Sequence, residues 1–577
     1  MRILGISAFH RDAAAALLVD GKTVAAVQED RYTKRLQDES FPIRAIRACL
    51  SQGDIHVRDL DHIVFYEKPL RKFERELASL ITSFPKSASA FSSGMFLWLG
   101  DRLWLKNRIV DELELDSPDK ISFTEHQLAH AASAFYPSPF EEAAVLTLDD
   151  AGEWATTSLC RGSGSQLEML SEIRFPHSLG MIVSAFAQYL GFEPGTQDHL
   201  VESLASYGTP KYTDEFAKLV LEGEAGSFSV AQDAFRYRFD REQLFTPALE
   251  ELFGPARTGG GALRYTEGDS RDADIAASLQ HVVEERTLAL CRELHDKVPT
   301  KGLCFAGRLA ENRALNARIL CDSPFEELYV PPAPHDAGAA LGAALYVHHA
   351  VGGATDREVL DHSFLGMAVE NRPEDGVIQL GGAEQAEATL IKRLMDGDRI
   401  GWIRGKHEFG AHSHGHRSTL ADPRKPDARM RLLAAVQQLE PYVPCCMAVP
   451  VESAAEYFEL PEGAQYPLSF GQLAVPATDK LREIAPSCVQ PDGSAWPLLI
   501  DKKRDPEFHS LLLAFARGAG VPLLAHSTFA LRGSPMVRIE SDAVAAFLRT
   551  ELECLIVDDR MYEPLTTTGL PPRPTVG

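Results

Sequence analysis

A pattern of buried strand, acidic residue and hairpin occurs twice in the first part of the chain. Residues 1–8 are a mainly apolar run, and the runs at 13–18 and 23–29 are joined by the dipeptide Asp20-Gly21. An Asp-Gly pair between two such runs is typical of a tight β-hairpin. The apolar residues 144–148 likewise end in an acidic pair and precede a second strand-like run. This repetition predicts a duplicated α/β unit.

The chain is long enough for two or more domains, because one hydrophobic core rarely serves 577 residues. We expect the first domain to span residues 1–350, where strand and helix patterns alternate. Its long helical patterns lie at 178–190, 274–296 and 337–351. Residues 351–383, which are rich in glycine and charge, are typical of a linker. A second α/β domain is expected at 384–565 and a proline-rich tail at 566–577.

Composition and charge disfavour several classes of function. The net charge of −24 disfavours a broad surface for nucleic acid or for anionic membranes. No run reaches the ~18 apolar residues that a membrane-spanning helix needs, and the chain starts directly on a strand-like run. The nine cysteines form no Cys-x-x-Cys pair, which favours reduced, buried thiols. We therefore expect a cytoplasmic protein that binds neither nucleic acid nor membrane.

Two histidines at helical spacing suggest a metal site. His126 and His130 lie four residues apart, so a helix would place both rings on one face. Asp149 at the end of an expected strand and Asp336 at the start of an expected helix stand where α/β folds hold ligands. These four residues are the candidate metal ligands. The spacing also fits two ordinary helix histidines, and each aspartate also fits a turn or a helix cap.

Two strand ends in the first domain carry further candidates. His10 and Asp12 follow the first strand and could act in acid–base catalysis or bind a substrate, although a turn aspartate beside an incidental histidine fits equally. Gly307 ends another strand-like run, and a glycine there lets a nucleotide phosphate approach the backbone. The segment from Gly307 to Asn312 is thus a candidate cofactor site, but the large side chain of Arg308 opposes that approach.

The second domain contains a loop rich in glycine and histidine at residues 405–418. Its four histidines within ten residues allow a metal interpretation, but no cysteine is near them. We favour an anion site formed by His416, Arg417 and Ser418 beside exposed backbone amides. A solvated loop without a ligand is the remaining alternative.

Taken in order, these segments resemble the natural-product carbamoyltransferase family, which includes nodulation-factor, aminoglycoside and cephamycin carbamoylating enzymes. The resemblance extends over nearly the whole chain and is specific, because many separate motifs occur in the same order. The stretches that carry it include Phe9-His10-Arg11-Asp12-Ala13, His126-Gln127-Leu128-Ala129-His130, Gly152-Glu153-Trp154-Ala155-Thr156, Asp336-Ala337-Gly338, Arg417-Ser418 and Asp422-Pro423-Arg424.

The resemblance implies a fold, a cofactor and the roles of several residues. It implies a duplicated actin-like ATPase (RNase H-like) N-terminal domain and a YrdC-like α/β C-terminal domain. In that family the second domain joins carbamoyl phosphate and ATP into a carbamoyl adenylate, and the first domain, with bound iron, transfers the carbamoyl group to a hydroxyl. His10 and Asp12 would face the acceptor. By position, iron or another divalent metal would be held by His126, His130, Asp149 and Asp336.

The sequence departs from the family pattern where carbamoyl phosphate and nucleotide would bind. A family arginine is lost in Ala411-His412-Ser413-His414, and the family's Asp-Gly-Thr-Ala-Arg becomes Asp492-Gly493-Ser494-Ala495-Trp496. A family glycine is replaced by Arg308, and a strand-end Asp-Gly by Asp149-Asp150. Each charge-assisted contact to a phosphate contributes about 1.5–3 kcal/mol. These losses therefore argue against carbamoyl phosphate as a ligand and weaken the case for ATP.

A divergent member that runs a different reaction fits this sequence best. It resembles homologues associated with antibiotic biosynthesis, in which aziridine formation closes an azabicyclic amino acid: a substrate amine displaces a sulfate ester, with a small partner protein. Arg308 is the residue expected to donate hydrogen bonds to the departing sulfate. The residues expected to act as base are His10, Asp12, Asp150 and Glu202. Two alternatives stay open, an ATP- and carbamoyl-phosphate-dependent O-carbamoyltransferase and a non-catalytic pseudoenzyme subunit. A dimer or a heteromeric complex fits each of these.

Overall fold

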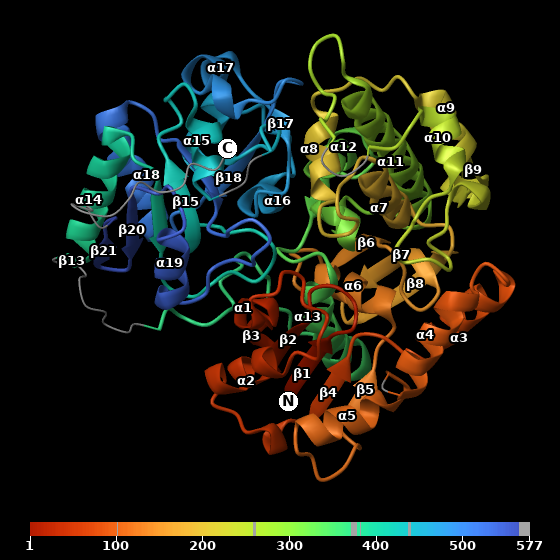
Figure 1. Cartoon of the computed structure of the whole chain (residues 1–577). Coiled ribbons are helices and arrows are strands. Elements are labelled where there is room, and N and C mark those ends of the chain that lie inside the picture. The colour runs from red at the N-terminus through yellow and green to blue at the C-terminus, as the bar shows by residue number, and fades with distance from the viewer. Residues whose placement is uncertain (101, 258–260, 371–377, 381, 437–439, 565–577) are drawn as a thin grey trace.

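Three large β-sheets organise the chain, and each lies in its own lobe (Figure 1). The computed structural model describes residues 1–577 except 101, 258–260, 371–377, 381, 437–439 and 565–577. Two five-stranded sheets are built from residues 2–329, and a nine-stranded sheet is built from residues 378–562. The tail expected at 566–577, and parts of the expected linker at 371–377 and 381, lie outside the described residues.

The first sheet has the strand order β3-β2-β1-β4-β5. Its strands are β1 (Arg2–Ser7), β2 (Ala14–Val19), β3 (Lys22–Gln28), β4 (His62–Phe65) and β5 (Ile121–Phe123). The first three are antiparallel, β4 runs parallel to β1, and β5 runs parallel to β4. The Asp20-Gly21 turn has positive φ at both residues, 50° and 80°, as a two-residue turn of this type needs. The expected hairpin is confirmed.

The second sheet repeats this topology in the order β12-β11-β6-β7-β8. Its strands are β6 (Glu142–Leu148), β7 (Ala155–Ser163), β8 (Gln166–Arg174), β11 (Gly302–Ala306) and β12 (Glu327–Tyr329). Again the first three strands are antiparallel, and the later two extend the sheet in parallel from the first of them. The duplicated α/β unit is therefore confirmed, and the paired sheets form an actin-like, RNase H-like N-terminal domain.

Two helices pack against each other between these sheets. Helix α6 (His126–Phe135) contacts β6 and β11, and α13 (Asp336–Tyr346) contacts β1 and β2. Small residues permit the close approach, since a Cβ added to Gly342 would come within 1.9 Å of the carbonyl oxygen of Ala129. The helix expected at 337–351 is divided, because α13 ends at Tyr346 and the chain continues as a π-helical turn, Val347–Val351.

The remaining helices of the first domain surround the two sheets. Those expected at 178–190 and 274–296 are confirmed as α7 (Leu179–Tyr189) and α11 (Arg271–Lys297). Ser178 caps α7 by accepting a hydrogen bond from the amide of Met181 at 3.1 Å. The others include α2 (Ile43–Gln52), α5 (Leu105–Glu112), α8 (His199–Ala205), α9 (Thr213–Leu219), α10 (Pro247–Phe253) and α12 (Arg313–Asp322).

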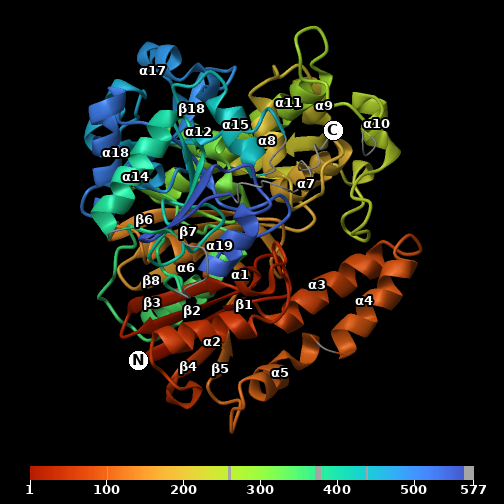
Figure 2. The ribbon, with the colours of Figure 1, turned by 60° about the vertical axis from the view of Figure 1, so that its left-hand side comes forward.

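A hairpin of two helices, α3 (Pro69–Thr82) and α4 (Ala88–Gly100), extends away from the first sheet (Figure 2). It exposes several large apolar side chains, among them Phe84 and Phe96. Among the helices of the described residues, none is both long and apolar enough to cross a membrane.

The third sheet belongs to an α/β domain with mixed strand directions. Its strand order is β13-β21-β20-β14-β15-β19-β16-β18-β17. The strands are β13 (Ile378–Gln379), β14 (Ile400–Ile403), β15 (Arg417–Ala421), β16 (Cys446–Pro450), β17 (Val475–Pro476), β18 (Ser494–Ile500), β19 (Leu524–Thr528), β20 (Cys554–Val557) and β21 (Arg560–Tyr562). The helices are α14 (Ala383–Asp396), α15 (Ala428–Ala435), α16 (Gln465–Ser469), α17 (Asp479–Ile484), α18 (Pro506–Ala519) and α19 (Glu540–Phe547). The α/β class expected for the C-terminal domain is confirmed.

Candidate functional site

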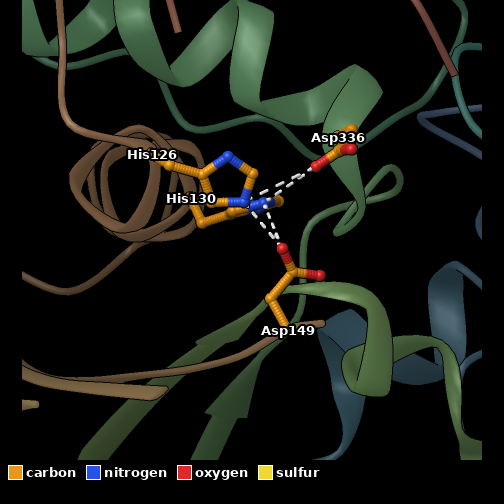
Figure 3. A group of neighbouring side chains, drawn as sticks. All are labelled: His126, His130, Asp149 and Asp336. Atoms are coloured by element: carbon orange, nitrogen blue, oxygen red, sulfur yellow. Dashed lines mark hydrogen bonds and ion pairs between the residues drawn. The ribbon is translucent and has the colours of Figure 1, made fainter. Parts of the chain in front are cut away.

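The four candidate metal ligands lie together in the N-terminal domain. Helix α6 begins with His126 and carries His130 one turn later, Asp149 follows β6, and Asp336 begins α13. One ligand atom from each residue lies within 4.8 Å of the others, and all four residues are buried. Figure 3 shows both rings and both carboxylates pointing toward a common centre. The tight packing of α6 on α13 therefore joins residues that are up to 210 positions apart.

The hydrogen bonds of this cluster leave the ring nitrogens arranged for coordination. Nε2 of His126 lies 2.7 Å from Oδ2 of Asp149, and Nε2 of His130 lies 3.3 Å from Oδ1 of Asp336. Nδ1 of His130 lies 3.2 Å from the carbonyl oxygen of Pro334, which only a protonated Nδ1 can satisfy. That contact favours the tautomer whose Nε2 faces the centre.

The electrostatics of the cluster favour a cation at its centre. Burial alone would lower the pKa of His130, but hydrogen bonds and charges from Asp149 and Asp336 outweigh it and raise the pKa to about 10. Burial would raise the pKa of Asp336, but His10 and His130 hold it well below its ordinary value. Two buried carboxylates thus hold positive charge here. Two imidazoles and two carboxylates form a donor set suited to iron(II), manganese or zinc, so the residues fit a divalent metal.

His10 extends the cluster toward open space. Its Nδ1 lies 2.6 Å from Oδ2 of Asp336, and its side chain is 29% exposed. The loop that carries it is strained, because Phe9 and Asp12 have positive φ values of 68° and 55°. Such conformations cost about 1–3 kcal/mol each and concentrate at functional sites. Asp12 faces His335, with 3.5 Å between Oδ2 and Nδ1. His335 was not predicted as a site residue, although it directly precedes Asp336 in the sequence.

A cavity of about 490 Å³ lies between the two domains, within the size range of small-molecule sites. The two aspartates of the cluster form part of its wall, and the C-terminal domain lines the cavity through residues such as His412, Trp496 and Thr528. The predicted site residues that line it are His10, Asp12, Asp149, Glu202, Arg308, Asn312 and Asp336. Those outside its lining are His126, His130, Asp150, Gly307, His416, Arg417 and Ser418.

Arg308 and Asp150 are joined by ion pairs within the protein. The guanidinium of Arg308 contacts Oδ1 of Asp150 through Nε at 2.9 Å and Nη2 at 2.5 Å, and it also bonds to Asp198. Nη1 of Arg11 lies 3.0 Å from Oδ2 of Asp150. Burial would raise the pKa of Asp198, but Arg308 and Arg11 lower it. These partners already engage both groups. The structure therefore does not support Asp150 as a base, or Arg308 as a hydrogen-bond donor to the departing sulfate.

Glu202 of α8 and Asn312 both accept hydrogen bonds from backbone amides at the start of α12. Oε1 of Glu202 accepts hydrogen bonds from the amides of Arg313 at 2.7 Å and Ala314 at 3.2 Å. Burial raises the pKa of Glu202 to about 7, so this carboxyl group can exchange a proton near neutral pH. Asn312 caps the helix by accepting from the amide of Leu315 at 2.8 Å. The helix-cap function accounts for Asn312, and no cofactor role is needed.

Gly307 is required by packing. Its φ is 92°, and a Cβ there would lie 2.2 Å from the carbonyl oxygen of Leu148. The glycine therefore lets the chain turn sharply beside β6. Since the next residue, Arg308, closes the adjacent space with its ion pairs, a nucleotide phosphate is not expected at this turn.

The anion site expected in the histidine-rich loop is filled by the chain itself, which corrects that prediction. Oε1 of Glu408 accepts from the amides of His414 at 2.7 Å and His416 at 2.8 Å and from the hydroxyl of Ser413 at 2.8 Å. The guanidinium of Arg417 is fully buried and donates to backbone carbonyl oxygens. The amides that we expected to be exposed are thus satisfied by an internal carboxylate.

His416 and Ser418 also have internal partners. The ring of His416 stacks on Phe364 with 3.6 Å between the centroids, and its Nδ1 lies 2.6 Å from the carbonyl oxygen of Lys406. The hydroxyl of Ser418 lies 2.9 Å from Nε2 of His526. The sequence of this polar loop resembles that of a ligand site, and only the fold shows that Glu408 lies at its centre.

Comparison with known proteins identifies the family. The carbamoyltransferase N-terminus model matches residues 2–345, and the carbamoyltransferase C-terminus model matches residues 391–563. The chain belongs to the carbamoyltransferase family. The uncharacterized protein sll1178 of Synechocystis sp. is 35% identical, covering 96% of each chain. The nodulation protein NolNO of Sinorhizobium fredii is 31% identical over 97% of this chain and 80% of its own. The nodulation protein NolO of Bradyrhizobium diazoefficiens is 30% identical over 75% of this chain and 77% of its own.

Proposed function

We propose that this member of the carbamoyltransferase family is an enzyme of antibiotic biosynthesis that closes an aziridine ring on a diamino acid by displacing a sulfate ester. The proposal rests mainly on one observation: positions where the family pattern implies phosphate binding are filled by the chain's own ion pairs. Arg308 stands between Asp150 and Asp198. A triphosphate would have to displace this buried pair, which is costly because two carboxylates would lose their counter-charge.

The reaction needs few groups from the protein. A substrate amine attacks the neighbouring carbon, the new C–N bond forms as the C–O bond breaks, and sulfate leaves with the electron pair. The amine must lose a proton, and His10 is the favoured base because its ring is oriented by Asp336 and is exposed to the cavity. Asp12 and Glu202, which also line the cavity, are the further candidates.

The interdomain cavity could position the reacting groups of the substrate. A near-attack geometry for a three-membered ring requires the amine and the carbon to be held together, and an interdomain cavity of about 490 Å³ suits such restraint. A divalent metal bound by His126, His130, Asp149 and Asp336 would supply Lewis-acid charge at the edge of this cavity. The retained ligand cluster also favours an enzyme over a non-catalytic subunit.

The test is turnover of a sulfated diamino acid by the full chain, alone and with any small partner protein found in the same gene cluster. We expect release of inorganic sulfate and a ring-closed product by mass spectrometry. His10→Asn should lower the rate at least 100-fold. His56→Asn is the matched control, because His56 is an exposed helix-capping histidine outside the cavity, and this variant should keep the rate.

Two other outcomes would contradict the proposal. Pyrophosphate release from ATP that depends on carbamoyl phosphate would support the O-carbamoyltransferase alternative. Folded, metal-loaded protein that turns over neither substrate would support the pseudoenzyme.

A further inference from the structure

A buried arginine that lines the cavity reaches from the N-terminal domain to the C-terminal domain. Arg313 is the first residue of α12, and its guanidinium lies over the ring of Trp496 in β18, 4.2 Å from the centroid. Its Nε donates to the carbonyl oxygen of Gly471 at 2.6 Å. Only 5% of the residue is exposed. The side chain is therefore held in one orientation by two contacts with the C-terminal domain.

Arg313 forms no ion pair with a described residue, unlike the other arginines that line the cavity. Each of the others has a carboxylate partner: Arg11 with Asp150, Arg31 with Asp30, Arg308 with Asp150 and Asp198, and Arg532 with Glu440. No carboxylate of the described residues lies within 4 Å of the Arg313 guanidinium. The charge of Arg313 acts on the carboxyl group of Glu202, but Oε1 of Glu202 accepts from the backbone amides of Arg313 and Ala314 and not from the guanidinium.

A buried cation without an ion-pair partner is costly, so the arrangement is expected to be completed by an anion. Because Nε is used by Gly471, the donors that remain are the two terminal nitrogens, which have no protein partner within the described part of the chain. Two nitrogens on one edge of a guanidinium match a carboxylate or a sulfate oxygen pair. The face of Trp496 fixes the plane in which such a group would bind.

We infer that Arg313, seated on Trp496, binds an oxyanion group of the substrate, its carboxylate or its sulfate ester, at the interface between the domains. A single arginine without an ion-pair partner suits a group that carries one negative charge better than the multiple charges of a nucleotide triphosphate. The identity of the ligand as part of an amino-acid-derived substrate rests on the proposed function, whereas the anion site itself does not.

Binding of simple anions to the full chain tests the site without turnover. Calorimetry with sodium acetate and sodium sulfate, at constant ionic strength maintained with chloride, should detect a saturable site for at least one of them. Arg313→Gln should weaken binding at least tenfold. Arg313→Lys keeps the charge but loses the planar pair of donors and should weaken it about threefold to tenfold. Tighter binding of acetate would identify the carboxylate as the bound group, and tighter binding of sulfate would identify the ester.

A control and a second variant separate binding from folding. Arg532→Gln removes a cavity arginine that is already paired with Glu440, at 2.6 Å, and should change affinity less than twofold. Trp496→Leu leaves Arg313 in place but removes its seat, and should weaken binding at least threefold even if Arg313→Gln fails to fold. Unchanged affinity in folded Arg313→Gln, or no binding of either anion to the unaltered protein, would overturn the inference.

The outcome also distinguishes this inference from the proposed function. Anion binding that depends on Arg313, together with no turnover of a sulfated diamino acid, would leave the site standing and refute the reaction. Turnover that is insensitive to Arg313→Gln would leave the reaction standing and refute the site.

Discussion

Replacing Arg308 with alanine should destabilise the N-terminal domain strongly, because it leaves buried carboxylates without a counter-charge. Asp150 is 1% exposed and Asp198 is 7% exposed, and Arg308 bonds to both. Removing one partner of a buried pair typically costs about 3–5 kcal/mol. Since Asp150 keeps Arg11 at 3.0 Å, we expect the lower end of that range, about 3 kcal/mol.

A double-mutant cycle with Asp198 isolates the interaction. Asp198→Asn alone should cost less than Arg308→Ala, since Arg308 retains Asp150 and the asparagine oxygen can still accept from Ser184. The double variant should be more stable than the sum of the two single effects predicts, by about 1–3 kcal/mol. Thermal unfolding of the full chain followed by circular dichroism would measure these differences as changes in Tm.

The destabilisation caused by Arg308→Ala should depend on pH. Without Arg308, the effect of burial on the pKa of Asp198 is opposed less, by Arg11 and Ser184, so the pKa rises and the carboxylate takes up a proton more readily in the folded state. The destabilisation of Arg308→Ala should therefore shrink as the pH falls from 8 to 5. Arg532→Ala, which removes a more exposed pair, is the control and should cost less than about 1 kcal/mol. An Arg308→Ala variant as stable as the control, with no pH dependence, would refute the reasoning.

Three further predictions concern the other groups of the site. Burial raises the pKa of Glu202 from 4.5 to about 7, so this group should lower the free energy of unfolding by on the order of 2–3 kcal/mol as the pH rises from 4.5 to 7. Glu202→Gln should flatten that part of the curve of stability against pH, and an unchanged curve would contradict the raised pKa. The pKa of Glu408, which burial would raise, is instead lowered to about 2 by His416, Arg417 and the loop amides, so its stabilisation should be present above pH 4.5 and fade toward pH 2. Glu408→Gln should thus cost about 1.5–3 kcal/mol at pH 7 by chemical denaturation, and equal stability at pH 7 would show that the loop does not depend on the charge. His130→Ala should lose bound iron, manganese or zinc in equilibrium dialysis, whereas His416→Ala, outside the cluster, should retain it.

Much of the fold could be predicted because its signals are local. The Asp20-Gly21 turn specifies a hairpin through the positive φ that glycine allows, and apolar runs such as β6 mark buried strands. The grouping of His126 with His130 follows from helical spacing alone. Asp149 and Asp336 could be nominated from their places at a strand end and a helix start, but their approach to the histidines depends on how α6 packs on α13.

The partners of charged residues could not be predicted, because they come from distant parts of the chain. In the sequence, Arg308 is a possible free donor beside a glycine, but in the structure it bonds to Asp198 and Asp150. The sequence likewise suggests exposed amides in the histidine-rich loop, but in the structure these amides donate to Glu408. Arg313 is one arginine among many in the sequence, and only its contact with Trp496 across the domain boundary sets it apart. Local backbone preference thus determines the elements, whereas the compensation of charge is a property of the assembled interior, where each buried ion must find a partner that the neighbouring sequence does not reveal.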